Sequence, residues 1–189
     1  MSPEHGEAWF PERAARWIDS AARTGALNVN FVGGDPAPSI PFILETLRHV
    51  KSDIPVIFNS NSYYSSEAAG LLKGIVDIYL LDFRYFSERC AVRLSQAPGY
   101  PKTAKRNILF AGRQGDLIIR LLVMPGHIEC DAKPIVGWIG KNLGNAYVNI
   151  LPQYRPCWRA GEYPEISRPL SHEEYMEVVE HAREAGLFS

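Results

Sequence analysis

Short, strongly apolar runs alternate along this chain with longer stretches in which apolar residues recur at helical spacing. Five runs have the length and composition of β-strands: LNVNFVGG, PVIFNSN, VDIYLLDF, LIIRLLVMPG and AYVNILPQY. The stretches between them predict helices that begin near Ser39, Ser65, Pro98 and Asp131. This alternation is typical of parallel strands joined by right-handed helical crossovers.

Two further helices flank the predicted sheet. The first ends near Gly25 and carries apolar residues at helical spacing, namely Ala14, Trp17, Ile18 and Ala21. The last begins at Ser171, where Glu174 completes a capping box. Its side chains expected to face the core are Met176, Val179 and Ala182.

The predicted strands are near-continuously apolar, so we expect both faces of the sheet to be covered. The chain has 189 residues, which suits a single domain. A complete eight-stranded barrel typically needs about 250 residues. The sequence therefore predicts an α/β fold, either an open doubly wound sheet or an incomplete TIM-like (β/α) barrel of about five to six parallel strands.

Composition narrows the range of partners. The formal net charge is -1 and no basic patch stands out, so nucleic acid is not an expected partner. No apolar run reaches the length of a membrane span and no leader is recognisable, which predicts a cytoplasmic protein without a membrane partner. Cys90, Cys130 and Cys157 are too few and too widely spaced for a disulfide framework, so we expect buried, reduced thiols and no metal site.

Polar residues, with two glycines and a proline, gather where the predicted strands end. In chain order they are Gly33, Gly34, Asp35, Pro36, Asn59, Asn61, Asp82, Arg84, Arg120, His127, Gln153, Tyr154 and Arg155. Each position alone has a structural explanation, because glycines make tight turns, asparagines cap helices and Arg120 can pair with Asp82. Since the carboxyl ends of parallel strands share one edge, five polar ends together predict a ligand pocket.

The ordered set of strand ends also carries a family resemblance. The segments FVGGDP, NSNSYY, DIYLLDFRY, IIRLLVMPGH and VNILPQYRP follow one another at strand spacing. In this order they resemble radical S-adenosylmethionine (SAM) proteins related to pyruvate formate-lyase activating enzymes, from about Ala8 to Leu187. The resemblance implies one radical SAM core domain over residues 1–189.

The resemblance implies a role for each matching position. The GGE-type motif that receives the amino group of SAM matches Gly33, Gly34, Asp35 and Pro36, with aspartate in place of the more usual glutamate. Positions that approach the ribose or carboxylate match Asn59, Asn61 and Arg120. Positions near the adenine match Met124, Leu151 and Gln153. Positions on the substrate side match Asp82, Arg84, His127, Tyr154 and Arg155.

One part of the family pattern is missing. The family binds its 4Fe-4S cluster with a C-x3-C-x2-C loop after the first strand, and this sequence contains neither that loop nor that strand. The resemblance implies that the intact protein cleaves SAM to a 5′-deoxyadenosyl radical, which abstracts hydrogen from a glycyl radical enzyme or another substrate. We expect this chain alone to be inactive and to expose a sheet edge through which a homodimer can form.

Three other functions compete with this interpretation. His127-x-Glu129 and Pro156-Cys157 suggest a zinc hydrolase or deaminase, but the second cysteine of the P-C-x-x-C motif falls on Ala160. A TIM-barrel hydrolase acting on sugar phosphates would place its glycine-rich loop late in the chain, whereas the glycine pair here is early. The third is a non-catalytic barrel fragment. Such a fragment would bind SAM, or would bind a partner protein through residues 154–168.

Overall fold

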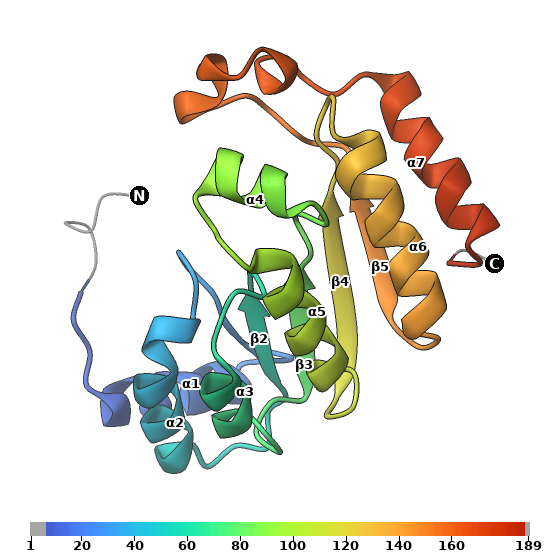
Figure 1. The fold of residues 1–189 in the computed structure, drawn as a ribbon. Coiled ribbons are helices and arrows are strands. Elements are labelled where there is room, and N and C mark those ends of the chain that lie inside the picture. The colour runs from blue at the N-terminus through green and yellow to red at the C-terminus, as the bar shows by residue number, and fades with distance from the viewer. Residues whose placement is uncertain (1–6, 188–189) are drawn as a thin grey trace.

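The computed structural model of the chain describes residues 7–187. Five parallel strands form one sheet in sequence order, β1-β2-β3-β4-β5 (Figure 1). They are β1 (Val29–Phe31), β2 (Val56–Ser60), β3 (Ile78–Asp82), β4 (Asp116–Leu122) and β5 (Tyr147–Leu151). The predicted α/β fold is confirmed, and the sequential strand order is that of a barrel wall.

One helix precedes β1, and at least one helix follows each of the five strands. The α-helices are α1 (Pro11–Arg23), α2 (Ile40–His49), α3 (Ser66–Leu71), α4 (Glu88–Ser95), α5 (Tyr100–Ala111), α6 (Lys133–Asn142) and α7 (His172–Glu184). Short 3-10 turns are η2 (Ala37–Ser39), η4 (Trp158–Glu162) and η5 (Pro164–Ile166), and η3 (Ile128–Ala132) is a π turn. Within residues 7–187, no helix has the length and apolar character needed to cross a membrane.

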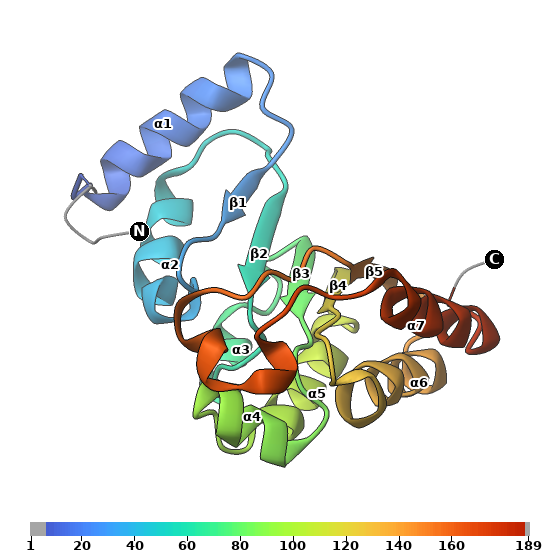
Figure 2. The same ribbon diagram turned by 90° about the horizontal axis from the view of Figure 1, so that it is seen from above.

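The two faces of the sheet differ in burial. Alternate residues of a strand point to opposite faces, and on one face Tyr79, Leu81 and Ile119 are completely buried. On the other face Leu80 and Leu122 are only half-buried. Figure 2 shows α3, α5 and α6 together on one side of the sheet. The expectation that both faces are covered is wrong for residues 7–187, because the second face is the inside of a curved wall that no described helix covers.

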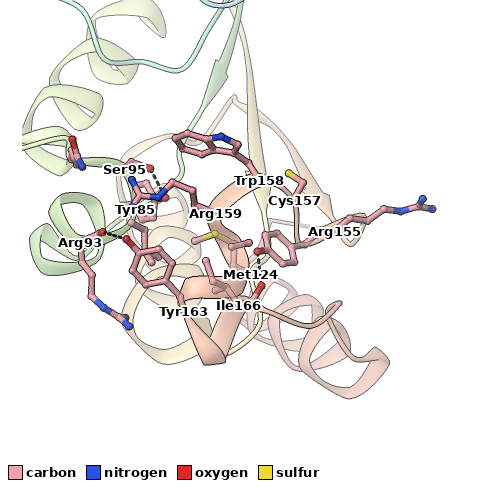
Figure 3. Close-up of a pocket in the computed structure, with 14 residues that line it drawn as sticks. Tyr85, Arg93, Ser95, Met124, Arg155, Cys157, Trp158, Arg159, Tyr163 and Ile166 are labelled. Atoms are coloured by element: carbon pink, nitrogen blue, oxygen red, sulfur yellow. Dashed lines mark hydrogen bonds between the residues drawn. The ribbon is translucent and has the colours of Figure 1, made fainter. Parts of the chain in front are cut away.

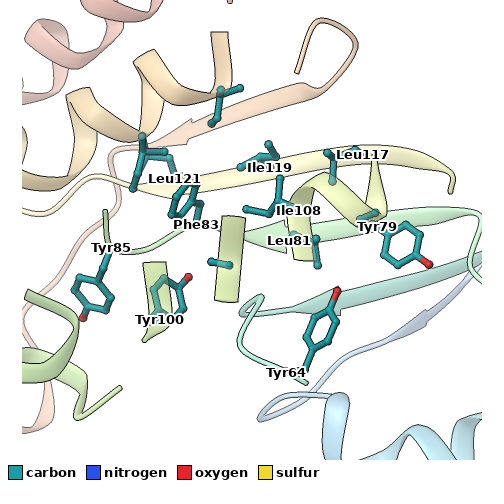
Figure 4. Close-up of a cluster of buried hydrophobic side chains, with 14 of the residues drawn as sticks. Tyr64, Tyr79, Leu81, Phe83, Tyr85, Tyr100, Ile108, Leu117, Ile119 and Leu121 are labelled. Carbon is teal, nitrogen blue, oxygen red and sulfur yellow. The ribbon is translucent and has the colours of Figure 1, made fainter. Parts of the chain in front are cut away.

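The main hydrophobic core lies between the sheet and these helices (Figure 4). Ile119 and Leu121 of β4 and Ile108 of α5 are among its fully buried side chains. Phe83, just after β3, meets Trp138 of α6 edge to face, with 5.5 Å between ring centroids. Burying side chains of this size contributes about 1.5–3 kcal/mol each, so this layer fixes the sheet that positions the strand ends.

Serine caps set several helix starts. Ser65 accepts a hydrogen bond from the Ala68 amide at the start of α3, and Ser171 and Glu174 form the predicted capping box of α7. Other details differ from the sequence prediction. Trp17 of α1 is 60% exposed, and Val178 rather than Val179 is the buried valine of α7.

The segment around the predicted third and fourth helices also differs. The helix predicted from Pro98 is α5, but α4 before it was not predicted from the sequence. Asp131 belongs to the π turn η3 and does not begin a helix, since α6 starts at Lys133.

Candidate functional site

All five strands point their carboxyl ends toward the same edge, where residues 152–170 pass over the sheet from β5 to α7 (Figure 1). We call these residues the strap. Two adjoining hollows lie at this edge. The sheet pocket, of about 460 Å³, is lined by Asp82, Arg84, Arg120, Leu122, Leu151, Gln153, Tyr154, Arg155 and Cys157. The strap pocket, of about 420 Å³, lies beneath η4 and η5.

Figure 3 shows the strap pocket and its side chains. Arg93 of α4, with Tyr85 and Met124 from the segments after β3 and β4, lines one part of it, and Trp158 and Tyr163 line it from the strap. Tyr154, Arg155 and Cys157 border both pockets, so the two hollows share one wall. A ligand in the sheet pocket would therefore lie next to the strap.

Arg120 of β4 is held rigidly in the sheet pocket. Its Nε donates to Asp82 Oδ1 at 2.7 Å, and its Nη2 donates to Asn59 Oδ1 at 2.7 Å. The register pairs Asp82 with Arg120 directly across neighbouring strands, which explains the contact. The pairing of Arg120 with Asp82, which was expected from the sequence as a structural explanation for Arg120, is therefore present. Among residues 7–187 no group hydrogen-bonds Arg120 Nη1, and the Arg120 side chain is 29% exposed, so one donor group remains for a ligand.

Asp82 also accepts hydrogen bonds from Arg84, at 2.8 Å from Nη2 and 3.3 Å from Nε to Oδ2. Arg84 is more than half exposed. A buried hydroxyl supports the same strand ends: Tyr100 donates toward the backbone oxygens of Asn61 and Asp82 and accepts from the Arg84 amide. Burial raises the pKa of Tyr100, so this hydroxyl stays protonated. Tyr100 was not predicted as a site residue because it lies on helix α5 and not at a strand end.

The turn after β1 is fastened to the end of β2. Gly33 and Gly34 have φ of +110° and +53°, which favours glycine. Asp35 accepts from the Asn61 amide at 2.7 Å, from the Ser60 hydroxyl at 3.0 Å and from the Ala37 amide at 3.0 Å. The carboxylate of Asp35 therefore holds the loop in place and is occupied by protein donors.

The structure gathers part of the predicted set. The sheet pocket contains seven predicted residues: Asp82, Arg84, Arg120, Leu151, Gln153, Tyr154 and Arg155. Asn59 joins it through Arg120, and Met124 lines the strap pocket. Gly33, Gly34, Asp35, Pro36 and Asn61 lie at the same edge but line neither hollow.

His127 lies elsewhere, 5% exposed, in a group with Cys90, Cys130 and Asp131. This cluster was not predicted from the sequence. Burial and the neighbouring Asp131 raise the pKa of Cys130 to about 12. Cys90 is buried as expected, whereas Cys157 is exposed, so the expectation of a buried thiol is wrong there.

The zinc deaminase arrangement is not formed. Glu129 would have to lie beside the metal as the general acid and base, but its side chain is 76% exposed and paired with Lys133. Cys157 lies in the wall of the two pockets and is not among the residues grouped with His127.

Comparisons with known proteins bear on the fold. No family model matches the chain. In three dimensions it is similar to a domain of pyruvate-formate lyase-activating enzyme from Bacteroides vulgatus, with a TM-score of 0.66 over 86% of this chain and 96% of that domain. The chain shares the fold of that domain. The identity is 16%, so the likeness extends to the fold alone.

A sequence relative is much closer but uncharacterised. A protein of Methanocaldococcus jannaschii is 44% identical over 185 residues. The match includes 98% of this chain and 54% of the relative, so the chain spans about half the length of that curated protein.

Proposed function

We propose that the sheet pocket binds SAM and that the chain is the larger part of a radical SAM domain related to the pyruvate formate-lyase activating enzymes. The observation that carries this proposal is the guanidinium of Arg120, which lines the sheet pocket, is held by Asp82 and Asn59, and has no hydrogen bond to Nη1 among residues 7–187. A guanidinium oriented in this way can donate to a carboxylate such as that of SAM.

The other walls of the sheet pocket suit the rest of a charged nucleoside. Leu122 and Leu151 offer apolar surface for a base, and the exposed Gln153 offers both a donor and an acceptor to its edge. The volume of about 460 Å³ lies within the range of small-molecule sites.

The cysteines of this chain do not fit a 4Fe-4S cluster. Such a cluster needs convergent thiolates, but Cys90 and Cys130 lie beside His127 whereas Cys157 borders the pockets. In the family that the chain resembles, the cluster delivers the electron that cleaves SAM. The part we assign to this chain is to bind the nucleoside and hold its carboxylate.

Titration calorimetry of the chain with SAM and with S-adenosylhomocysteine tests the proposal. Arg120→Ala should weaken binding by about 1.5–3 kcal/mol through loss of a charged hydrogen bond, which is roughly tenfold to more than a hundredfold in Kd. The matched control is Arg113→Ala, an exposed arginine beside β4 at the opposite edge of the sheet, which should leave Kd unchanged.

Two results would contradict the proposal. An equal Kd for Arg120→Ala and the parent chain would remove Arg120 from the site. Failure of SAM and its analogue to bind, together with binding of a sugar phosphate, would favour the TIM-barrel hydrolase interpretation.

A further inference from the structure

Four potential metal ligands meet between α4 and the connection from β4 to α6. Cys90 comes from the first turn of α4, and His127, Cys130 and Asp131 come from the connection between β4 and α6. The Sγ atoms of Cys90 and Cys130 are 3.6 Å apart, and Cys130 Sγ is 3.3 Å from His127 Nδ1. Asp131 Oδ2 is 3.3 Å from His127 Nδ1 and 3.6 Å from Cys130 Sγ.

These separations match the edges of a tetrahedron around zinc. Zinc bonds of about 2.3 Å to sulfur and about 2.0 Å to nitrogen or oxygen, at tetrahedral angles, place ligand atoms about 3.3–3.8 Å apart. The four distances above lie in or beside this range, and all four ligand atoms lie within 4.8 Å of one another. A disulfide is a poorer description, because its sulfurs would be about 2.05 Å apart.

The surroundings orient the ligand atoms inward. Asp131 Oδ1 accepts from the amides of Phe86 and Ser87 at 2.7 and 2.8 Å, which leaves Oδ2 facing the cluster. His127 Nε2 is buried without a hydrogen-bond partner among residues 7–187. Glu165 Oε1 of the strap lies 3.9 Å from it, beyond hydrogen-bond distance, and is paired with Arg93.

We propose that Cys90, His127, Cys130 and Asp131 form a zinc site that no comparison assigns. Two thiolates and an imidazole select zinc over magnesium or calcium, which prefer oxygen ligands. Four protein ligands leave no open position, so the site is structural. The metal joins α4 to the connection between β4 and α6, which contains the π turn η3.

Metal content tests this proposal directly. The chain is purified with a thiol-free reductant, loaded with Zn²⁺, dialysed and analysed by mass spectrometry of the metal. One equivalent of zinc should remain per chain, and Cys90→Ser and Cys130→Ser should lose it. Cys157→Ser is the matched control, since this thiol is exposed outside the cluster, and it should retain the full equivalent.

Cobalt keeps the test decisive if the ligand variants fail to fold. Co²⁺ in the parent chain should give the visible bands of tetrahedral coordination and a thiolate charge-transfer band, both displaced by Zn²⁺. Bound Zn²⁺ should also leave one thiol, that of Cys157, open to a thiol reagent. Absence of stoichiometric zinc, a cobalt spectrum of six oxygen ligands, or a Cys90–Cys130 disulfide in the reduced preparation would each overturn the proposal.

Discussion

Replacing Asn107 by alanine tests how the loop between β2 and α3 is held next to the pocket. Asn107 lies on α5 and is completely buried. Its Nδ2 donates to the backbone oxygens of Ser62 at 3.0 Å and Tyr64 at 2.8 Å, and its Oδ1 accepts from Arg106. One amide thus anchors the turn that follows Asn61.

The expected cost follows from these contacts. Asn107→Ala removes the side-chain donor to the Ser62 oxygen, and a buried acceptor left unpaired costs about 1–3 kcal/mol. The Tyr64 oxygen keeps Arg106 Nη2 at 2.6 Å, so losing its second hydrogen bond adds only about 1 kcal/mol. The free energy of unfolding should therefore fall by about 2–4 kcal/mol.

Urea unfolding followed by circular dichroism measures this change. Asn142→Ala is the control, because that exposed amide also donates to a backbone oxygen, at 2.8 Å to Trp138, and its loss should stay within about 0.5 kcal/mol. Asn107→Asp keeps the size and the acceptor for Arg106 but loses both donated bonds, so it should destabilise at least as much as alanine. Equal effects of Asn107→Ala and Asn142→Ala would refute this account of the loop.

Two further predictions concern α7 and the sheet edge. Arg168, with the Ser171 and Gly126 amides, lowers the pKa of Glu174 from 4.5 to about 2, so its stabilising effect is complete above about pH 4.5 and is lost as pH falls toward about 2. Between about pH 4.5 and pH 2, urea titrations should show that the free energy of unfolding falls more steeply for the parent chain than for Glu174→Gln. An equal fall in both proteins would contradict this prediction. The β1 edge is flanked by the exposed Leu27 and Val32, so light scattering should show a concentration-dependent dimer that Val32→Lys weakens; a monomer at every concentration would refute the edge contact.

Much of the fold could be predicted because its determinants are local. Each strand is a short apolar run, and Ser65 and Ser171 mark helix starts through side-chain bonds to amides three residues away. Helix α4 escaped prediction because it has eight residues and buries only Cys90 and Ala91. Its position depends on tertiary contacts that no local pattern encodes.

The burial of the sheet faces could not be predicted for a related reason. An apolar strand shows that its side chains avoid water, but it does not show what covers them. Leu80 and Leu122 are as apolar as Leu81 and Leu121, yet only the latter pair meets the helices.

The two candidate sites differ in how far sequence could reveal them. Residues at the ends of parallel strands converge by geometry, so the Asp82–Arg120 pairing follows from the fold class. The zinc cluster has only a local signal, the spacing of His127, Cys130 and Asp131, which places three ligands within one helical turn. The fourth ligand, Cys90, lies on α4. Because α4 was not predicted, no sequence pattern placed Cys90 near the other three ligands.

The charges of the sheet pocket are better explained by binding than by stability. Asp82 and Arg120 are largely withdrawn from water, at 14% and 29% exposure, and desolvating such a pair offsets much of its attraction. Apolar side chains would pack as well beside Leu122. In Arg120→Ala, Arg84 keeps a hydrogen bond to Asp82, but the buried Asn59 Oδ1 loses its donor, which should cost about 1–3 kcal/mol of unfolding free energy. A structural ion pair would lose only this stability, whereas a ligand site would lose SAM affinity as well.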